Sequence, residues 1–247
     1  MDLKGRVAVV TGASRGVGLK IAEALEARGM VVASVARSGV GFAADVSDAE
    51  DVARLKTAVE VELGVPAVVV NAAGIFGPIA LVKDSDPHEW VETIMIDAVG
   101  PYLVTRAFVG GMVEAKWGRI VNLSSAASLH TPGPMNSAYG TAKVALNQFT
   151  RHLAAELEGT GVTANVIHPG DVKTAMWADI RDKKEAVRGD AYDSWVRWVD
   201  ATGGDPPEKA AKLVIDIIES DVNGRFLWID DPLQTPIPSW GDSADPL

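Results

Sequence analysis

The sequence contains no cysteine among its 247 residues. Without thiols, the chain has no disulfide bond, no thiolate metal site and no cysteine nucleophile. No apolar run reaches the roughly 18–20 residues of a transmembrane helix, and the first residues lack the pattern of a secretory signal peptide. We therefore expect a cytoplasmic protein without a membrane partner. No group of His, Asp and Glu residues has metal-ligand spacing, so we also expect no metal.

Basic side chains are also in deficit, with 23 Lys and Arg against 33 Asp and Glu, a net charge of −10. A surface of this sign repels nucleic acid, so we expect no nucleic-acid partner. Hydrophobic residues make up 47% and charged residues 23%, which is typical of a soluble globular protein.

Short runs of Val, Ile and Leu alternate with amphipathic segments along the whole chain. Such continuous runs are typical of parallel strands that are buried on both faces. We therefore predict an α/β fold, a doubly wound parallel sheet of the Rossmann type in a single domain over residues 1–247. The predicted strands are Val7–Val10, Met30–Val35, Ala67–Val70, Ile120–Leu123, Val162–Ile167 and Phe226–Ile229.

A glycine-rich loop follows the first predicted strand and precedes a predicted helix. Its glycines allow a tight turn and a close approach to a pyrophosphate, which the helix N-terminus then binds. A glycine triplet alone also occurs in ordinary turns, but this strand–turn–helix setting favours dinucleotide binding. The cofactor-binding residues predicted here are Gly12, Ser14, Arg15, Gly16, Val17 and Gly18.

The second predicted strand ends without the carboxylate that commonly binds the ribose 2′-hydroxyl of NAD. Arg37 stands beside that position, and Arg15 lies in the glycine loop. Two guanidinium groups suit a 2′-phosphate, so we predict NADP(H) as the preferred cofactor and NAD(H) as the alternative. The competing interpretation is that both are ordinary solvated arginines.

Tyr139 and Lys143 are four residues apart and therefore share one face of a predicted helix. A phenol titrates near pH 10 in water, and a neighbouring ammonium stabilises the phenolate. We therefore expect Lys143 to lower the pKa of Tyr139. On its own, such a pair is usually structural.

With the glycine loop, these residues resemble the short-chain dehydrogenase/reductase family along nearly the whole chain. The resemblance implies that Tyr139 protonates a carbonyl oxygen, that Lys143 holds the nicotinamide ribose and that Ser125 orients the substrate. It also implies homodimers or homotetramers formed through the Tyr139 helix. Further cofactor contacts implied by the family are Asp45, Val46, Asn71, Ala72, Gly74, Pro169, Gly170, Val172 and Thr174.

The chain departs from the family at Asp97, where the fourth catalytic residue is usually Asn. In the family, the main-chain carbonyl at this position holds a water that relays protons to the lysine. Pro101 lacks the N–H that would bond the carbonyl of Asp97. We therefore predict a helix kink and a surviving relay through this carbonyl.

A second departure is the short connection between Arg37 and Asp45. A parallel crossover normally needs at least about 10–12 residues, and only seven separate these two. We predict that the crossover helix is missing, that the third strand is very short and that the adenine side of the pocket is exposed.

The resemblance identifies residues 175–205 as the substrate lid, and residues 232–247 form a proline-rich tail. Trp177 is the aromatic residue of the lid that we expect to contact substrate, which would favour a partly apolar carbonyl compound. The alternative is that the lid aromatics only pack the lid onto the domain.

These features predict an enzyme that reduces a ketone to an alcohol with NADPH, with 3-oxoacyl and polyketide-like ketones as candidates. Oxidation of a secondary alcohol is the alternative reaction. A dinucleotide-sensing scaffold is the non-enzymatic alternative, but such a protein should have lost Ser125, Tyr139 or Lys143, and all three are present.

Overall fold

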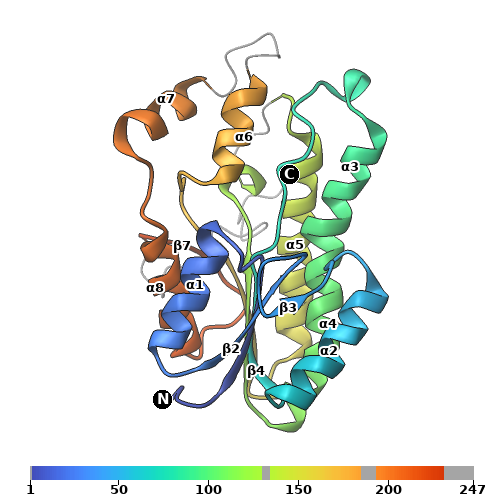
Figure 1. Ribbon diagram of the computed structural model, residues 1–247, viewed down its shortest axis with the longest axis vertical. Helices are drawn as coiled ribbons and strands as arrows, with labels where there is room; N and C mark the ends of the chain where they lie inside the picture. The colour runs from blue at the N-terminus through green and yellow to red at the C-terminus, as the bar shows by residue number, and fades with distance from the viewer. Residues whose placement is uncertain (1, 130–133, 185–192, 231–247) are drawn as a thin grey trace, which may run out of the picture.

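The computed structural model describes residues 2–129, 134–184 and 193–230. The predicted tail and part of the predicted lid lie outside these residues. Seven parallel strands form one sheet in the order β3-β2-β1-β4-β5-β6-β7 (Figure 1). They are β1 Val7–Thr11, β2 Val31–Ala36, β3 Phe42–Ala43, β4 Pro66–Asn71, β5 Gly118–Leu123, β6 Val162–His168 and β7 Phe226–Trp228.

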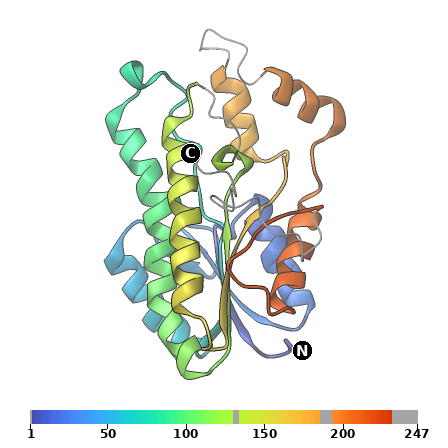
Figure 2. The same cartoon turned by 180° about the vertical axis from the view of Figure 1, so that it is seen from behind.

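Helices cover both faces of the sheet (Figures 1 and 2). Helices α1 and α8 pack on one face, and α2, α4 and α5 pack on the other. The helices are α1 Gly16–Ala27, α2 Ala49–Glu62, α3 Pro87–Ile94, α4 Gly100–Glu114, α5 Ser137–Glu156, α6 Ala175–Lys184, α7 Asp193–Thr202 and α8 Pro207–Ile218. Short helical turns occupy Val82–Asp84, Met95–Val99 and Ala126–Ser128.

The predicted doubly wound α/β fold is confirmed, and each predicted strand lies within two residues of an observed one. The agreement has a simple cause: β1, β5 and β6 are buried along their full length, so apolar runs mark them clearly.

The predicted short third strand is also confirmed. β3 has two residues, and only residues 37–41 connect it to β2, with no helix between them. β3 pairs only with Val35 and Ala36, the last two residues of β2. The connection therefore has to run back only along these two residues before β3 begins. Gly39 permits this turn with its positive φ of 78°.

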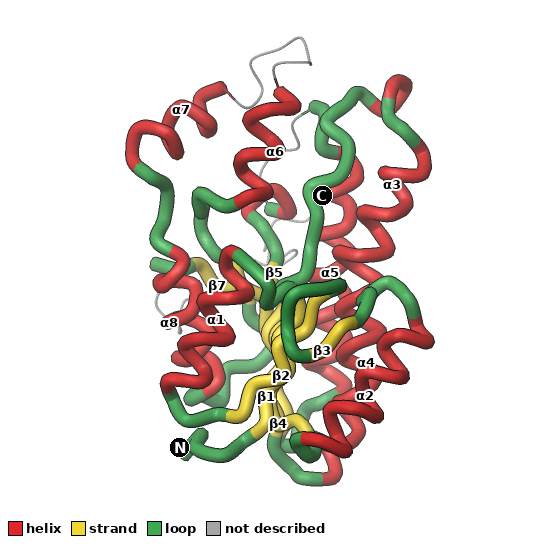
Figure 3. The backbone as a smooth tube through the Cα atoms, in the orientation of Figure 1, coloured by secondary structure: helices red, strands yellow, loops and turns green. Residues whose placement is uncertain are grey.

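The loops that follow β1, β4, β5 and β6 gather at the carboxyl edge of the sheet. The strand order reverses between β1 and β4, and ligands of such sheets bind outside the carboxyl ends at this point. Helices α6 and α7 lie beyond the same edge (Figure 3). The fold therefore brings the predicted site residues to one end of the molecule.

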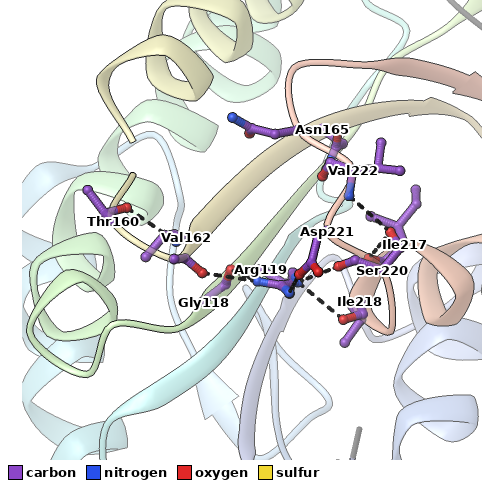
Figure 4. A network of polar contacts seen from close by, with 12 residues as sticks. Gly118, Arg119, Thr160, Val162, Asn165, Ile217, Ile218, Ser220, Asp221 and Val222 are labelled. Atoms are coloured by element: carbon purple, nitrogen blue, oxygen red, sulfur yellow. Dashed lines mark hydrogen bonds and ion pairs between the residues drawn. The ribbon is translucent and has the colours of Figure 1, made fainter. Parts of the chain in front are cut away.

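The Arg119 side chain forms a hydrogen-bond network at the opposite, amino end of the sheet (Figure 4). It is 1% exposed and donates hydrogen bonds to the carbonyls of Gly118, Gly161, Ile218 and Ser220. Its Nη2 also lies 2.8 Å from the exposed Asp221 carboxylate. One guanidinium thus ties β5 to the start of β6 and to the end of α8.

Candidate active site

The glycine loop is packed against the end of β4. The Thr11 hydroxyl accepts hydrogen bonds from the backbone N–H groups of Ala72 and Ala73, at 3.1 and 3.2 Å. A Cβ at Gly12 would lie 2.7 Å from the Ala73 nitrogen, and one at Gly18 would lie 2.4 Å from the Gly12 oxygen. Both positions therefore require glycine. The role of Thr11 was not predicted, because its two partners are about 60 residues distant in sequence.

The N-terminus of α1 is open to an anion. Its N-cap residue, Arg15, makes no side-chain capping bond, and the first turn has no acidic residue. By contrast, Asp48 caps α2 and Asp86 caps α3. Free N–H groups and the positive end of the helix dipole suit a phosphate. The loop that holds Ser14, Gly16 and Val17 thus fits the pyrophosphate of a dinucleotide.

Arg15 and Arg37 lie on the same rim of the sheet. The Ala13 N–H donates to the Val35 carbonyl at 3.2 Å, which joins the glycine loop to the end of β2 just before Arg37. Both arginines are exposed, and neither side chain forms an ion pair or hydrogen bond with another described residue. Both guanidinium groups are thus available to an anionic ligand.

The Asp45-Val46 pair follows β3 on the predicted adenine side. One Asp45 oxygen accepts the backbone N–H and the hydroxyl of Ser47, at 2.9 and 2.6 Å. Val46 is buried against Gly100, where a Cβ would lie 2.9 Å from the valine side chain. The Asp45 carboxylate is therefore held by its own turn.

Asn71 departs from its predicted place in the cofactor cleft. Its side chain is buried and donates to Asn122 at 2.7 Å and to Thr105 at 3.2 Å, and Asn122 donates on to Thr150. This polar chain crosses the interior from α4 to α5. Only the partly exposed backbone that follows, at Ala72 and Gly74, is left to line the cleft.

Ser125, Tyr139 and Lys143 converge as predicted. Tyr139 lies in the first turn of α5, and hydrogen bonding by the nearby Ser125 side chain lowers the pKa of Tyr139. The Lys143 Nζ lies 5.4 Å from the centre of the Tyr139 ring and donates to the Leu123 carbonyl at 3.0 Å. His168 also steadies the serine loop, since its Nδ1 accepts the Ala126 N–H at 3.2 Å.

Asp97 lies opposite Lys143 in a π-helical turn, Met95–Val99, between α3 and α4. The predicted irregularity before Pro101 is thus present, and the relay through the main-chain carbonyl of Asp97 stays a prediction. A second contact was not predicted: the Asp97 side chain itself reaches the lysine, and its Oδ2 lies 3.0 Å from Nζ. A buried carboxylate and a buried ammonium attract strongly, which explains the direct contact.

Burial and charge set the pKa values of these groups. Burial raises the pKa of Asp97 against the opposing effects of Lys143 and the Ile75 N–H. Burial alone would lower the pKa of Lys143, but Asp97 and Tyr139 together raise it. Burial raises the pKa of Tyr139 by more than Lys143 lowers it, and Asp97 adds to the upward shift. Lys143 thus has the expected lowering effect on the pKa of Tyr139, but burial outweighs it and the net pKa lies above the ordinary value.

The loop after β6 faces the glycine loop. Gly170 has a φ of 85°, and a Cβ there would lie 2.6 Å from the Ile229 side chain. Val172 forms a β-bridge with Gly204, which anchors the loop below the lid. A Cβ at Gly16 would lie 3.4 Å from the Thr174 methyl group. Pro169 to Thr174 thus form the wall opposite α1.

Apolar side chains surround the Tyr139 ring. It belongs to a buried cluster with Phe76, Ile79, Met135 and Ile180, and the Phe76 ring centre lies 4.7 Å away. Sequence reasoning missed these residues, because they come from three separate segments and no motif marks them.

Trp177 does not belong to this cluster, which corrects its predicted substrate contact. It is 3% exposed and packs with Val196 and Val199 of α7. On α6, Met176 and Ile180 are four residues apart and share the face toward Tyr139. Trp177 lies on the neighbouring face and packs α6 against α7 within the lid, whereas the alternative interpretation had the lid aromatics packing the lid onto the domain.

No helix in the described ranges is long and apolar enough to cross a membrane. Within the same ranges, no group of His, Asp and Glu side chains has an arrangement that could hold a metal ion.

Comparison with known proteins gives consistent matches. A profile of the family described as short chain dehydrogenase matches residues 6–185. The sequence is 36% identical over 208 residues to the 3-oxoacyl-acyl-carrier-protein reductase FabG of Pseudomonas aeruginosa, across 76% of this chain and 83% of that protein. It is 34% identical to the D-beta-hydroxybutyrate dehydrogenase of Cupriavidus necator, across 93% of this chain and 88% of that protein.

A solved structure of a variant actinorhodin polyketide ketoreductase with NADPH has a similar fold. Its TM-score is 0.81 at 28% sequence identity, across 90% of this chain and 95% of that one.

Proposed function

Because the chain belongs to the short-chain dehydrogenase family, whose members are NAD(P)-dependent oxidoreductases, we propose that it reduces a ketone to an alcohol with NADPH. The observation that carries this proposal is the contact between Ser125, Tyr139 and Lys143 beneath an apolar wall. A scaffold protein has no need to keep these three groups together at the dinucleotide end of the sheet.

NADPH fits the groups at the glycine loop. The open N-terminus of α1 would hold the pyrophosphate, and Arg15 and Arg37 would bind the 2′-phosphate. The cofactor would supply the hydride for the carbonyl carbon when bound. Lys143 would hold the nicotinamide ribose, and the walls of the cleft would be Asp45, Val46, Ala72, Gly74, Pro169, Gly170, Val172 and Thr174.

Tyr139 acts as the general acid in this proposal. Its O–H bond breaks as the proton passes to the carbonyl oxygen, and the resulting phenolate is stabilised by the nearby Lys143 ammonium. Ser125 donates a hydrogen bond to the same oxygen and orients it. His168 and the Ala126–Ser128 turn keep Ser125 in place.

The substrate of the proposal is a partly apolar ketone of the 3-oxoacyl or polyketide-like type. Phe76, Ile79, Met135 and Ile180 give the site an apolar wall beside the reacting oxygen. The names of two similar proteins, the FabG reductase and the actinorhodin ketoreductase, support the same class.

Oxidation of a secondary alcohol is the second candidate, favoured by the similarity to a D-beta-hydroxybutyrate dehydrogenase. Two observations weigh against it. Arg15 and Arg37 suit NADPH, which cells keep mostly reduced, and the raised pKa of Tyr139 keeps the phenol protonated. Oxidation needs the phenolate as the base.

The test is a panel of 3-oxoacyl esters, cyclic ketones and aldehydes, with the loss of reduced nicotinamide absorbance as the readout. We expect turnover of at least one 3-oxoacyl ester or cyclic ketone and a kcat/KM that is at least about tenfold higher with NADPH than with NADH. A clear preference for NADH, or turnover only of alcohols with the oxidised cofactor, would contradict the proposal.

Assembly and location remain predictions. A homodimer or homotetramer formed through α5 is expected from the family, and light scattering of the purified protein measures it. A cytoplasmic location is expected as well, and fractionation of cells that express the protein tests it.

A further inference from the structure

A buried ion pair sits behind the catalytic tyrosine. Asp97 is fully buried and Lys143 is 5% exposed, and their charged atoms are 3.0 Å apart. Two charges at this distance and depth hold each other firmly, because little water screens them. The lysine is therefore already paired before any ligand arrives.

The second oxygen of Asp97 anchors the loop after β4. Its Oδ1 accepts the Ile75 N–H at 2.8 Å, and a Cβ at Gly74 would lie 3.0 Å from Oδ2. Phe76, which packs on the Tyr139 ring, directly follows this anchored residue. Asp97 thus fixes both the charge next to Tyr139 and the apolar wall above it.

Four groups act on the Tyr139 hydroxyl from the elements packed around it. Lys143 comes from its own helix, Asp97 from the π-helical turn, Asp171 from the loop after β6 and Ser125 from the loop after β5. Lys143 and Ser125 favour the phenolate, whereas the two carboxylates oppose it. An asparagine at position 97 would remove the carboxylate that faces Lys143 directly.

We propose that Asp97 is a positioning residue. Its carboxylate forms an ion pair with Lys143, offsets the positive charge of the ammonium and thereby keeps Tyr139 as a neutral phenol, which biases the site toward carbonyl reduction. The bias toward reduction rests on the proposed function. The effect on the state of Tyr139 does not, because it is a property of the protein without cofactor or substrate.

The sign of the effect follows from the charges. In Asp97→Asn, Lys143 loses its carboxylate, and the Tyr139 phenolate becomes the nearest anion that can pair with it. The phenolate is then stabilised, so the pKa of Tyr139 falls. Alcohol oxidation, which uses the phenolate, should reach its plateau at lower pH than in the wild type.

The direct experiment is an ultraviolet titration of tyrosinate absorbance in the cofactor-free protein. The chain has three tyrosines, and subtracting a Tyr139→Phe variant of the same background isolates Tyr139. We expect Tyr139 of Asp97→Asn to titrate about one pH unit or more below that of the wild type. In Asp97→Asn with Lys143→Met, this shift should disappear, because no ammonium remains.

Several outcomes would overturn the proposal. One is an unchanged titration of Tyr139 in Asp97→Asn, and another is the same shift in the double variant. If Asp97→Asn does not fold, the wild type still tests the idea. Its Tyr139 must titrate above the ordinary phenol value of about 10, and a lower value sinks the proposal. A shifted titration without any ketone turnover would contradict only the proposed function.

Discussion

Charged side chains of this protein serve two different purposes, which depend on their burial. Asp97 and Lys143 are buried, paired and close to the reacting group. Arg15 and Arg37 are exposed and have no partner among the described residues. Buried charges therefore set the state of Tyr139, and exposed charges remain available for an anionic cofactor.

Arg37→Ala should lower kcat/KM for NADPH by about 10–100-fold, because the loss of a charge-assisted bond to a phosphate costs about 1.5–3 kcal/mol. The value for NADH, which lacks the 2′-phosphate, should stay within about twofold of the wild type. Steady-state kinetics with both cofactors measure this. Arg28→Ala, at the far end of α1, is the matched control and should change neither value. Equal losses with both cofactors would contradict the assignment of Arg37.

At the scale of elements, strands were more predictable than contacts. The run Val162–Ile167 predicts β6, because a strand that is buried on both faces is mostly apolar along its length. The irregular turn before Pro101 could also be predicted, since proline lacks the N–H. The ion pair between Asp97 and Lys143 could not, because it depends on how the π-helical turn Met95–Val99 packs against α5. The buried side chain of Asn71 was missed for the same reason.

The lid helices give a prediction at the same scale. Ile180→Ala should raise the KM for the ketone by about tenfold, because it removes apolar contact at the Tyr139 wall. Trp177→Phe should leave this KM within about twofold, since Trp177 packs against α7 and its Nε1 has no hydrogen-bond partner among the described residues. Kinetics with saturating NADPH provide the comparison. A larger effect for Trp177→Phe than for Ile180→Ala would restore Trp177 to the substrate site.

The Arg119 network predicts a large effect on stability. Arg119→Met should lower the free energy of unfolding by about 3 kcal/mol, because it leaves two buried and two partly buried carbonyls without their donor. Asp221→Asn is the matched control: its side chain is 95% exposed, so water screens the ion pair and the midpoint should barely move. Urea denaturation measures both variants. Similar losses in the two would show that the ion pair, rather than the carbonyls, carries the stability.

At the scale of the whole molecule, the candidate site residues lie at the carboxyl edge of the sheet. Buried polar networks lie at both ends, around Asp97 and Lys143 at the carboxyl edge and around Arg119 at the amino end. Segments as distant as the glycine loop, the Asp97 turn and α5 meet at that edge because the strand order reverses between β1 and β4. The net charge of −10 would repel an anionic cofactor at long range. Two exposed arginines and the uncapped α1 give the rim of this edge the opposite local sign.

The central claim is that Tyr139 supplies the proton for reduction of a ketone while other groups hold NADPH. Tyr139→Phe keeps the ring that packs on Phe76 and removes only the hydroxyl. NADPH should still raise the melting temperature of this variant as it does in the wild type, since binding stabilises the folded state. Ketone turnover should fall by at least about 100-fold, the contribution expected of a general acid. Turnover within about twofold of the wild type would contradict the account.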